Sequence, residues 1–466
     1  MTHLKKEIFR AYDIRGVVNQ DIDDENVYTL GRSAGTWFRS QGWTRAVVGH
    51  DCRHSSPAFQ SAIARGLAAC GVDVICLDLV STPVFYFACK YLGIQAGIMI
   101  TASHNPPEYN GFKIWGGETT IMGEAVYNLH AIAEKGEFAE GDGVISLHNI
   151  IPTYMDELLQ KVDIPYGLKI VVDGGNGTGG LVTAELLRRA GCDVVELFCE
   201  PDGDFPNHHP DPVVEKNTTF LKEKVLECGA DIGVGLDGDN DRIGAIDETG
   251  RLIDGDKLLS IYARKVLKDR PGATVIGDVK CSHLLFQDIE NMGGRAVMSV
   301  TGHSVVKARM IQESAALAGE MSGHMFFEDR FYGFDDGSYA ALRLVEVLVQ
   351  ENAKLSELAD RWPKTSATPE IRMDCGDGLN FPIVKKAQDY FSELAMSEGY
   401  TVETMDGIRL TFPDGWGLVR ASNTQSALVM RFEAETPDRL QEIRNFIEKP
   451  LFKWLHEMEA AGNKAK

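Results

Sequence analysis

The sequence has little positive charge for its length, no long apolar run and no closely spaced pair of cysteines. Among its 466 residues, 47 are lysine or arginine and 68 are aspartate or glutamate, which gives a formal charge of -21. Nucleic acid and anionic bilayers would be repelled by such a chain, so we expect neither as a partner. An anionic ligand would therefore need a locally basic site.

The other two absences indicate a compartment. No apolar stretch is long enough to cross a bilayer, and the first residues, "MTHLKKEIFRAYDIRG", contain no apolar signal core. The nine cysteines are odd in number and include no C-x-x-C pair, which argues against a disulfide framework and against a zinc site. We therefore expect reduced thiols and a cytoplasmic protein.

Length and pattern predict several α/β domains, because 466 residues are too many for one core. Three stretches share the order strand, polar turn, helix, small-residue turn, strand. They are "RAVVGHDCRHSSPAFQSAIARGLAACGVDVICL", "LKIVVDGGNGTGGLVTAELLRRAGCDVVEL" and "ATVIGDVKCSHLLFQDIENMGGRAVMSV". This order is typical of β-α-β units. We predict three similar mixed α/β domains, at residues 1–153, 154–253 and 254–367.

The pattern changes after "RWPKTSATPE". The stretch "GIRLTFPDGWGLVRASNTQSALVMRFEAET" alternates strands with turns, and an amphipathic segment, "PDRLQEIRNFIEKPLFKWLHEMEAA", follows it. This order predicts a smaller, antiparallel α+β fourth domain at residues 368–466.

The segment "DIGVGLDGDNDRIGAID" predicts a metal site. An apolar strand is followed by Asp237, Asp239 and Asp241 at alternate positions. Carboxylates this close repel one another unless a cation lies between them, and oxygen ligands alone favour Mg²⁺ or Ca²⁺. A solvated acidic turn is the alternative. An EF-hand does not fit, because Arg242 stands where its glycine should be and a strand precedes the loop. We predict Mg²⁺.

A glycine-rich segment, "VVDGGNGTGG", competes with that interpretation. Gly175, Gly177 and Gly180 match G-x-G-x-x-G after a strand, which by itself indicates an NAD-dependent oxidoreductase. However, Asp173 would place a carboxylate beside the pyrophosphate, and the other two repeats have no such motif. We interpret the segment as a structural turn between strand and helix.

The stretch "ITASHNPPEYNGFK" follows an apolar strand and contains Pro106 and Pro107, which stiffen the chain as it leaves the sheet. Ser103 and His104 therefore lie on a rigid turn at a strand end. Such a turn can hold a nucleophile in a fixed position.

Two further loops carry polar groups. In "GEMSGH", Glu320, Ser322 and His324 alternate, so in an extended loop they point the same way and suit sugar hydroxyls and proton transfer. The alternative is a polar strand edge. In "RASNTQS", from Arg420 to Ser426, an arginine and three hydroxyl groups suit a phosphate monoester, although an ordinary hydrophilic hairpin would look similar.

Taken together and in this order, these loops resemble those of the α-D-phosphohexomutase superfamily over nearly the whole chain. "TASHNP" resembles the phosphoserine loop, "DGDNDR" the metal loop, "GEMSGH" the sugar loop and "RASNTQS" the phosphate loop. The resemblance implies three related α/β domains and a smaller fourth domain around a central cleft.

The resemblance also implies roles for individual residues. The implied metal ligands are Asp237, Asp239 and Asp241, with an oxygen of phosphorylated Ser103. The implied catalytic residues are Ser103, Lys113 as a base, Arg242 beside the metal, His324 as an acid, and Arg15. The implied substrate contacts are Tyr12, Lys280, His303, Glu320, Ser322, Arg420, Ser422, Asn423 and Thr424. One departure is His50 in "GHDCR", where the superfamily often has arginine.

The implied activity is the interconversion of hexose 1- and 6-phosphates of mannose or glucose. It would use a phosphoserine enzyme, Mg²⁺, and a hexose 1,6-bisphosphate as intermediate and activator. Thr101 and Met321 favour the phosphomannomutase/phosphoglucomutase group over phosphoglucosamine mutases, which usually begin the serine loop with serine. The remaining alternative is a Mg²⁺-dependent sugar phosphatase in which water accepts the phosphoryl group.

Overall fold

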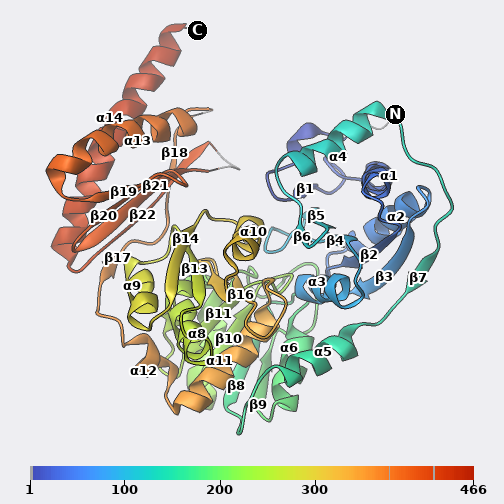
Figure 1. The fold of residues 1–466 in the computed structure, drawn as a ribbon, viewed down its shortest axis with the longest axis horizontal. Helices are drawn as coiled ribbons and strands as arrows, with labels where there is room; N and C mark the ends of the chain where they lie inside the picture. Colours follow the sequence, from blue (N-terminus) through green and yellow to red (C-terminus); the bar gives the residue numbers. More distant parts are fainter. Residues whose placement is uncertain (1–3, 377, 423–425, 466) are drawn as a thin grey trace.

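The structure is a computed structural model and describes residues 4–376, 378–422 and 426–465. The chain forms four sheets one after another, each packed with its own helices. In Figure 1 the four units follow one another in an arc, with the first unit (blue) and the fourth (red) at its two ends. The predicted fold class, three mixed α/β domains and an α+β domain, is confirmed.

The first unit contains a seven-stranded mixed sheet in the order β1-β5-β4-β2-β3-β7, with β6 paired to β5. The predicted β-α-β unit is present, because β2 and β3 pair in parallel on either side of α2. The elements are η1 (Lys6–Ile8), β1 (Ile14–Val17), α1 (Asp24–Ser40), β2 (Arg45–His50), α2 (Ser56–Ala68), β3 (Asp73–Leu79), α3 (Thr82–Tyr91), β4 (Ala96–Ile100), β5 (Tyr109–Gly116), β6 (Thr119–Thr120), α4 (Glu124–Lys135) and β7 (Ile145–Leu147).

The second unit has a five-stranded sheet in the order β12-β11-β10-β8-β9. Strands β8 and β9 pair in parallel around α6, as predicted. Helix α5 spans the predicted boundary at residue 153. The elements are α5 (Ile151–Gln160), β8 (Lys169–Asp173), α6 (Gly180–Arg189), β9 (Asp193–Leu197), η2 (Glu215–Thr218), α7 (Thr219–Cys228), β10 (Ile232–Leu236), β11 (Ile243–Asp247) and β12 (Leu252–Ile253).

The third unit has a four-stranded sheet in the order β14-β13-β15-β16. Its β13-α9-β14 segment is the third predicted parallel unit. The elements are α8 (Gly255–Asp269), β13 (Thr274–Asp278), α9 (His283–Asn291), β14 (Arg295–Ser299), α10 (His303–Glu313), β15 (Leu317–Gly319), β16 (Met325–Phe327), α11 (Gly337–Glu351) and α12 (Leu355–Ala359).

The fourth unit has a six-stranded antiparallel sheet in the order β17-β22-β21-β20-β19, with β18 also paired to β22. Strand β17 lies just before residue 368 and pairs with β22, so the sheet takes in residues 366 and 367. The elements are β17 (Ser366–Ala367), β18 (Ile371–Asp374), α13 (Asn380–Glu398), β19 (Thr401–Glu403), β20 (Ile408–Phe412), β21 (Gly415–Ala421), β22 (Ala427–Ala434) and α14 (Pro437–Ala465).

The hydrophobic cores do not follow the four units one to one. One cluster of buried side chains runs through the first three units and includes Phe87, Ile170, Leu259 and Phe334. The fourth unit has a separate cluster between residues 375 and 455. The first unit also has a cluster of its own, with members from Leu4 to Leu129. The first three units therefore share one core in addition to that cluster, and the fourth is packed mainly on itself.

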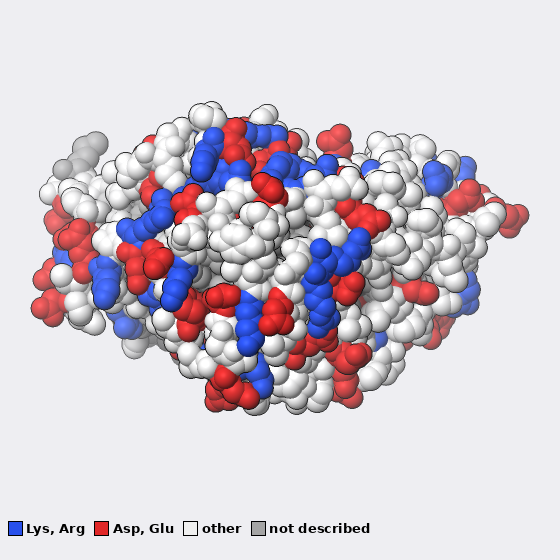
Figure 2. All heavy atoms as spheres, turned by 90° about the horizontal axis from the view of Figure 1, so that it is seen from below, with Lys and Arg blue, Asp and Glu red and all other residues white. Residues whose placement is uncertain are grey.

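The surface carries charges of both signs. Figure 2 shows one face, on which lysine and arginine are interspersed with aspartate and glutamate and form no broad area of one sign. No helix in the described ranges is long and apolar enough to span a bilayer. The nine cysteines, all of them within those ranges, are not joined in disulfide bonds.

Candidate active site

Ser103 lies where β4 leaves the first sheet. All five residues of β4 are buried, and β4 pairs antiparallel with β5 so that Met99 is opposite Lys113. Ser103 has a φ of 50°, a left-handed conformation that is uncommon for a residue other than glycine. Its amide donates to Thr101 Oγ1 at 2.9 Å. The loop therefore holds the serine in a strained, defined position at the strand end.

The side chain of Arg53 is hydrogen-bonded to the backbone of this serine loop. Its side chain is 1% exposed and its Nε donates to Asp51 at 3.1 Å. Its two terminal nitrogens donate to the carbonyl oxygens of Ser103, Asn105, Pro106 and Tyr109, at 2.7 to 3.0 Å. Four carbonyl groups of one loop thus converge on one guanidinium, which fixes the backbone on either side of Ser103.

The three predicted metal ligands lie together at the end of β10. Asp237, Asp239 and Asp241 are all buried, and their oxygens lie within 4.8 Å of one another. Ser103 Oγ donates to Asp237 Oδ2 at 2.8 Å, and His104 Nδ1 is 3.0 Å from the same Oγ. Because the hydroxyl has one proton and Asp237 accepts it, His104 donates to Oγ.

The electrostatics of this triad suit a cation. Burial, together with repulsion from Asp241 and Asp239, raises the pKa of Asp237 well above its usual range. Asp239 Oδ1 and Asp241 Oδ1 are buried and have no hydrogen-bond partner in the described part of the chain. Buried carboxylate oxygens without partners are costly, and a hard divalent cation would satisfy them. The residues present therefore fit Mg²⁺.

Lys113 lies beside two of these carboxylates. Its Nζ is 2.7 Å from Asp239 Oδ2 and 2.5 Å from Asp241 Oδ2. Burial lowers the pKa of Lys113, but Asp239 and Asp241 outweigh burial and hold it well above the usual value. Lys113 is therefore an ammonium here, held against two carboxylates of the triad that Ser103 also contacts.

Thr82 is a further contact of the triad that sequence reasoning missed. It begins α3 in the first unit, and both its hydroxyl and its amide donate to Asp239, at 2.6 and 2.9 Å. Thr82 therefore fixes the orientation of Asp239.

The third unit supplies His324. Its Nδ1 is 2.9 Å from Asp335 Oδ2, and its Nε2 accepts from Arg242 Nε at 3.0 Å. The neutral ring therefore has its proton on Nδ1. The amide of Arg242 also donates to Asp237, at 3.2 Å. The predicted acid and the predicted transition-state arginine are thus hydrogen-bonded to each other beside the triad.

The expectation of an extended "GEMSGH" loop is wrong. The segment turns back on itself, because the Glu320 amide donates to His324 O at 2.9 Å and Gly323 adopts a φ of 90°. Glu320 is buried and its carboxylate accepts from the Gly302 amide at 2.7 Å, whereas Ser322 is half-buried. The segment is therefore a turn and not an extended strand edge. Gly323, one of the two glycines in the segment, is the signal for the turn.

Other predicted contacts lie around this centre. Arg15 donates to Asn105 of the serine loop and to Asp13. The ring of Tyr12 lies against Gly302, where an added Cβ would come within 3.2 Å of it. The ring of His303 stacks on His324 at a centroid distance of 5.5 Å.

Two more of the predicted contacts are cationic or lie next to a cation. Lys280 Nζ lies 4.0 Å from Asp278 and 3.8 Å from Glu370. Burial and the ammonium of Lys307 hold the pKa of His303 well below its usual value. His303 is therefore neutral, and Lys280 supplies a positive charge at the end of β13.

The predicted phosphate loop lies in the fourth unit. Arg420 Nε donates to Asp406 Oδ2 at 3.0 Å, and the same oxygen accepts from the Thr301 amide of the third unit at 3.2 Å. Ser422 is buried, and its carbonyl accepts from Asn380 at 2.9 Å. Asn423 and Thr424 lie outside the described residues. The structure therefore places the first half of this loop.

The glycine-rich turn packs against the metal loop. A Cβ added to Gly177 would lie 2.7 Å from the carbonyl oxygen of Gly238, and the Thr178 amide donates to that oxygen at 3.0 Å. Asp173 accepts from the Gly175 amide at 2.9 Å. The glycines allow two backbones to approach closely, and the face they present is occupied by protein.

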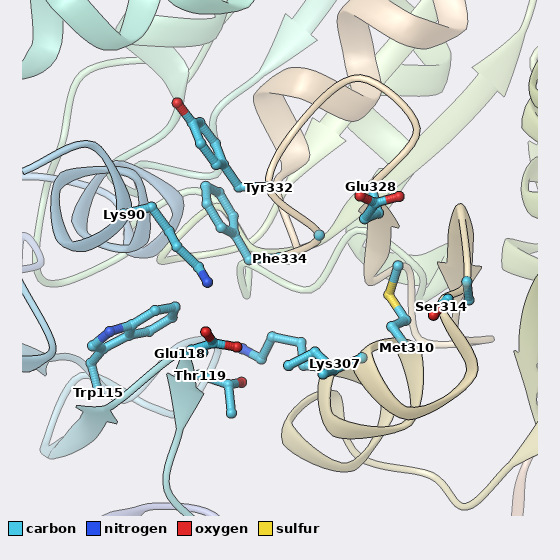
Figure 3. A pocket seen from close by; sticks show the side chains of 13 residues that line it. Lys90, Trp115, Glu118, Thr119, Lys307, Met310, Ser314, Glu328, Tyr332 and Phe334 are labelled. Atoms are coloured by element: carbon cyan, nitrogen blue, oxygen red, sulfur yellow. The ribbon is translucent and has the colours of Figure 1, made fainter. Parts of the chain in front are cut away.

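A separate pocket of about 280 Å³ lies between the first and third units. Its lining in the described part of the chain includes Lys90, Trp115 and Lys307 but none of the predicted site residues. Figure 3 shows Lys90 extending between Trp115 and Phe334. Lys307, which lines this pocket, donates to Asp335, and Asp335 also contacts His324 of the site.

A buried serine, an acidic triad, and lysine, arginine and histidine side chains from three α/β units form a site suited to phosphoryl transfer. Such chemistry depends on positioning and charge neutralisation, which these groups supply. The fold and the site together define a phosphoryl-transfer enzyme.

Comparison with known proteins identifies the family. Models of the phosphoglucomutase/phosphomannomutase family match the chain in four parts: α/β/α domain I over residues 6–140, domain II over 152–250, domain III over 254–365 and the C-terminal domain over 344–449. The chain therefore belongs to this family, within the α-D-phosphohexomutase superfamily, and is a hexose phosphate mutase.

Individual relatives agree with this result. A phosphomannomutase/phosphoglucomutase from Pseudomonas aeruginosa is 42% identical over 441 residues, which cover 95% of this chain and 94% of that protein. A phosphoglucomutase from Neisseria gonorrhoeae is 42% identical over 451 residues and 96% of each chain. The crystal structure of a family member from Burkholderia thailandensis has a TM-score of 0.91 and 38% identity, and covers 97% of this chain and 98% of that one.

Proposed function

We propose that this mutase interconverts the 1- and 6-phosphates of both glucose and mannose by way of a phosphoryl group carried on Ser103. The observation that carries the proposal is the placement of Ser103 Oγ, which lies 2.8 Å from one carboxylate of a buried acidic triad. A serine in that position could exchange a phosphoryl group with a ligand bound beside the triad.

The first transfer moves the phosphoryl group from Ser103 to the free hydroxyl of a bound hexose monophosphate. The bond between phosphorus and Ser103 Oγ breaks, a bond from phosphorus to the sugar oxygen forms, the sugar hydroxyl proton leaves to a base, and Ser103 Oγ takes up a proton. A hexose 1,6-bisphosphate results. After this intermediate turns around, its other phosphate returns to Ser103 and the isomeric monophosphate leaves.

The acidic triad would hold Mg²⁺, which when bound neutralises charge on the transferring phosphoryl group. Arg242 lies beside the triad and would contact the phosphoryl oxygens. Lys113 is the proposed base, and it can accept a proton only when neutral. The carboxylates that hold its pKa high are the proposed metal ligands, so its charge depends on what they bind.

The substrate is proposed to lie between the third and fourth units. Glu320 and Ser322 would accept hydrogen bonds from sugar hydroxyls, with His303, His324, Tyr12 and Lys280 around the ring. Arg420 and the loop from Ser422 through Asn423 and Thr424 would bind the phosphate that does not react, because a guanidinium offers a bidentate contact. The same contacts serve either orientation of the bisphosphate.

The test combines turnover with mass spectrometry. Purified protein with Mg²⁺ and a trace of glucose 1,6-bisphosphate should convert both glucose 1-phosphate and mannose 1-phosphate to the 6-phosphates, and peptide mapping should find phosphate on Ser103. Ser103→Ala should lose both turnover and the label, whereas Ser61→Ala, on the exposed side of α2, should keep both. Release of inorganic phosphate without the 6-phosphate would identify a phosphatase instead. Turnover of glucosamine phosphates alone would identify a phosphoglucosamine mutase.

A further inference from the structure

The third and fourth units meet at the turn that follows β13. Their main cores are separate, and a small cluster of Val279, Trp416 and Leu418 joins them. Val279 belongs to the turn after β13, and the other two belong to β21. The contact is therefore centred on the turn that carries Lys280.

Two arginines of the fourth sheet donate hydrogen bonds to three successive carbonyl groups of this turn. Arg409 Nη1 donates to Val279 O at 2.6 Å and to Cys281 O at 2.8 Å. Arg431 Nη1 donates to the carbonyl between them, that of Lys280. The backbone on both sides of the Lys280 Cα atom is therefore held by groups from a different unit.

The two guanidinium groups are themselves fixed. Arg409 is 1% exposed, and its Cζ lies 4.0 Å from the centre of the Trp416 ring; that of Arg431 lies 5.5 Å from the same ring. Trp416 Nε1 donates to Glu433 at 2.9 Å, and Glu433 also accepts from Ser282 Oγ at 3.1 Å. Cation-π contacts and hydrogen bonds thus hold both guanidinium groups, which form an arginine clamp on the Lys280 turn.

The head of Lys280 is directed to the site. Its Nζ lies 4.0 Å from Asp278, which accepts from the Met321 amide at 3.2 Å. The same ammonium group lies close enough to the buried Glu320 to favour its ionised form. The backbone of Lys280 is fixed and its ammonium group lies at the sugar loop. The side-chain torsions are therefore the main remaining degrees of freedom of Lys280.

We propose that Arg409 and Arg431 are positioning residues for the substrate, because they fix the turn that carries Lys280 and make its placement depend on the docking of the fourth unit. The proposal rests on the role of Lys280 as a substrate contact in the proposed function. Arg409 and Arg431 need not touch the substrate, and their effect passes through Lys280.

The test is a double-mutant cycle in the full-length protein, with glucose 1-phosphate as substrate. Arg431→Met keeps the apolar stem and removes the donor to Lys280 O. Alone, it should lower kcat/KM roughly tenfold to a hundredfold, the effect expected from loss of one charge-assisted hydrogen bond. In a Lys280→Ala background, the same change should lower kcat/KM by no more than about twofold, since neighbouring residues that act as a unit are not additive.

Two variants serve as controls. Arg439→Met removes an arginine of the same unit that pairs with Asp414 and Glu442 and stacks on Phe412, and it should leave kcat/KM unchanged. Arg431→Lys keeps the charge and a donor, which protects folding, and it should recover part of the activity with the same dependence on Lys280. Circular dichroism and the Tm of each variant report folding separately.

The outcomes separate the two levels of the proposal. Equal effects of Arg431→Met with and without Lys280, or wild-type kinetics for Arg431→Met, would overturn the positioning role. If Lys280→Ala alone has wild-type kinetics while Ser103→Ala is inactive, the role of Lys280 and the positioning role both fail, and the phosphoserine mechanism stands. If Arg431→Met does not fold, the cycle is run with Arg431→Lys, and additive effects there overturn the positioning role.

Discussion

At the scale of single residues, Asp406 is the clearest support for the proposed phosphate contact. Its Oδ2 accepts from Arg420 Nε, so the two terminal nitrogens of the guanidinium are the donors that a phosphate would engage. We expect Asp406→Ala to raise KM for glucose 1-phosphate roughly tenfold, because a misoriented guanidinium loses a charge-assisted bond, with kcat changed much less.

Steady-state kinetics on two variants would check this. Asp414→Ala is the matched control, because Asp414 pairs with Arg439 in the same unit at 2.9 Å. The prediction is wrong if KM stays at the wild-type value in Asp406→Ala, or if Asp414→Ala raises KM to the same extent.

Asp336 makes stability depend on pH. Its buried carboxyl accepts from Tyr154 Oη at 2.9 and 3.0 Å and from the Tyr339 amide at 2.9 Å. Burial raises the pKa of Asp336 from an ordinary 3.8 to about 7. Between these values the folded state keeps a proton that the unfolded chain has released, so the contribution of Asp336 to stability falls as pH rises through this window, by about 1.4 kcal/mol per pH unit.

We therefore expect Asp336→Asn to gain stability relative to the wild type as pH rises from 5 to 8, because the amide cannot ionise. Urea unfolding of both proteins at the two pH values measures the difference. Asp142→Asn, at an exposed position, should show no such trend. An unfolding free-energy difference that is the same at both pH values would contradict the prediction.

The residues that can be found from sequence are those next to a strand end. Ser103 and the three aspartates follow apolar runs directly, so their clustering could be inferred from the strand pattern. Thr82 could not, because the aspartate that it contacts lies 157 residues further along the sequence. Asp335 could not, because its contact with His324 depends on how the intervening segment folds back. Nothing in "STPVF" or "FDDG" marks such a contact.

At the scale of elements, the serine loop depends on Arg53 for its shape. Ser103 has a positive φ, which costs free energy, and the four carbonyl contacts of Arg53 offset that cost. We expect Arg53→Met to lower kcat about a hundredfold, because a relaxed loop moves Oγ away from Asp237. KM should change much less.

Single-turnover phosphorylation of Ser103 and steady-state kinetics would measure this effect. Arg65→Met is the control, because Arg65 lies on α2 and its Nε donates to Ser61 O of the same helix. An unchanged kcat in Arg53→Met would show that the serine loop keeps its shape without the hydrogen bonds from Arg53.

Elements with a long, regular pattern could be predicted, and short ones could not. The three parallel β-α-β units follow from apolar strands and glycine turns. Strand β17 has two residues, which are too few to show an alternating apolar pattern. It is a strand because its backbone pairs with β22. The turn at Glu320 was missed because alternation suits both an extended chain and a turn, and the backbone bond to His324 decides between them.

At the scale of the whole molecule, the sharing of one core by three units could not be inferred from the sequence. Strand and helix patterns show which faces are apolar, but they do not show which unit covers them. Phe87 and Phe334 illustrate this, since each belongs to one unit and contributes to a cluster that spans three. The separate core of the fourth unit could not be inferred from the sequence either.

These cores predict two cooperative units of unfolding. One cluster, with members from Val47 to Trp362, spans the first three sheets and ties the first unit to them, although that unit also has a cluster of its own from Leu4 to Leu129. The fourth unit is joined to the others through the small apolar contact around Trp416, the arginine contacts to the Lys280 turn and the hydrogen bond from Thr301 to Asp406. A unit with its own core and few apolar contacts to the rest can open alone.

Hydrogen exchange read by mass spectrometry at moderate urea should therefore show β20 to β22 and α13 exchanging together at a lower free energy than β4, β10 and β13, which should exchange as one group. Trp416→Ala, which removes the joining side chain, should lower the protection of the fourth unit more than that of the other three. A single free energy for all four units, or early opening of the first unit alone, would contradict the two-body arrangement.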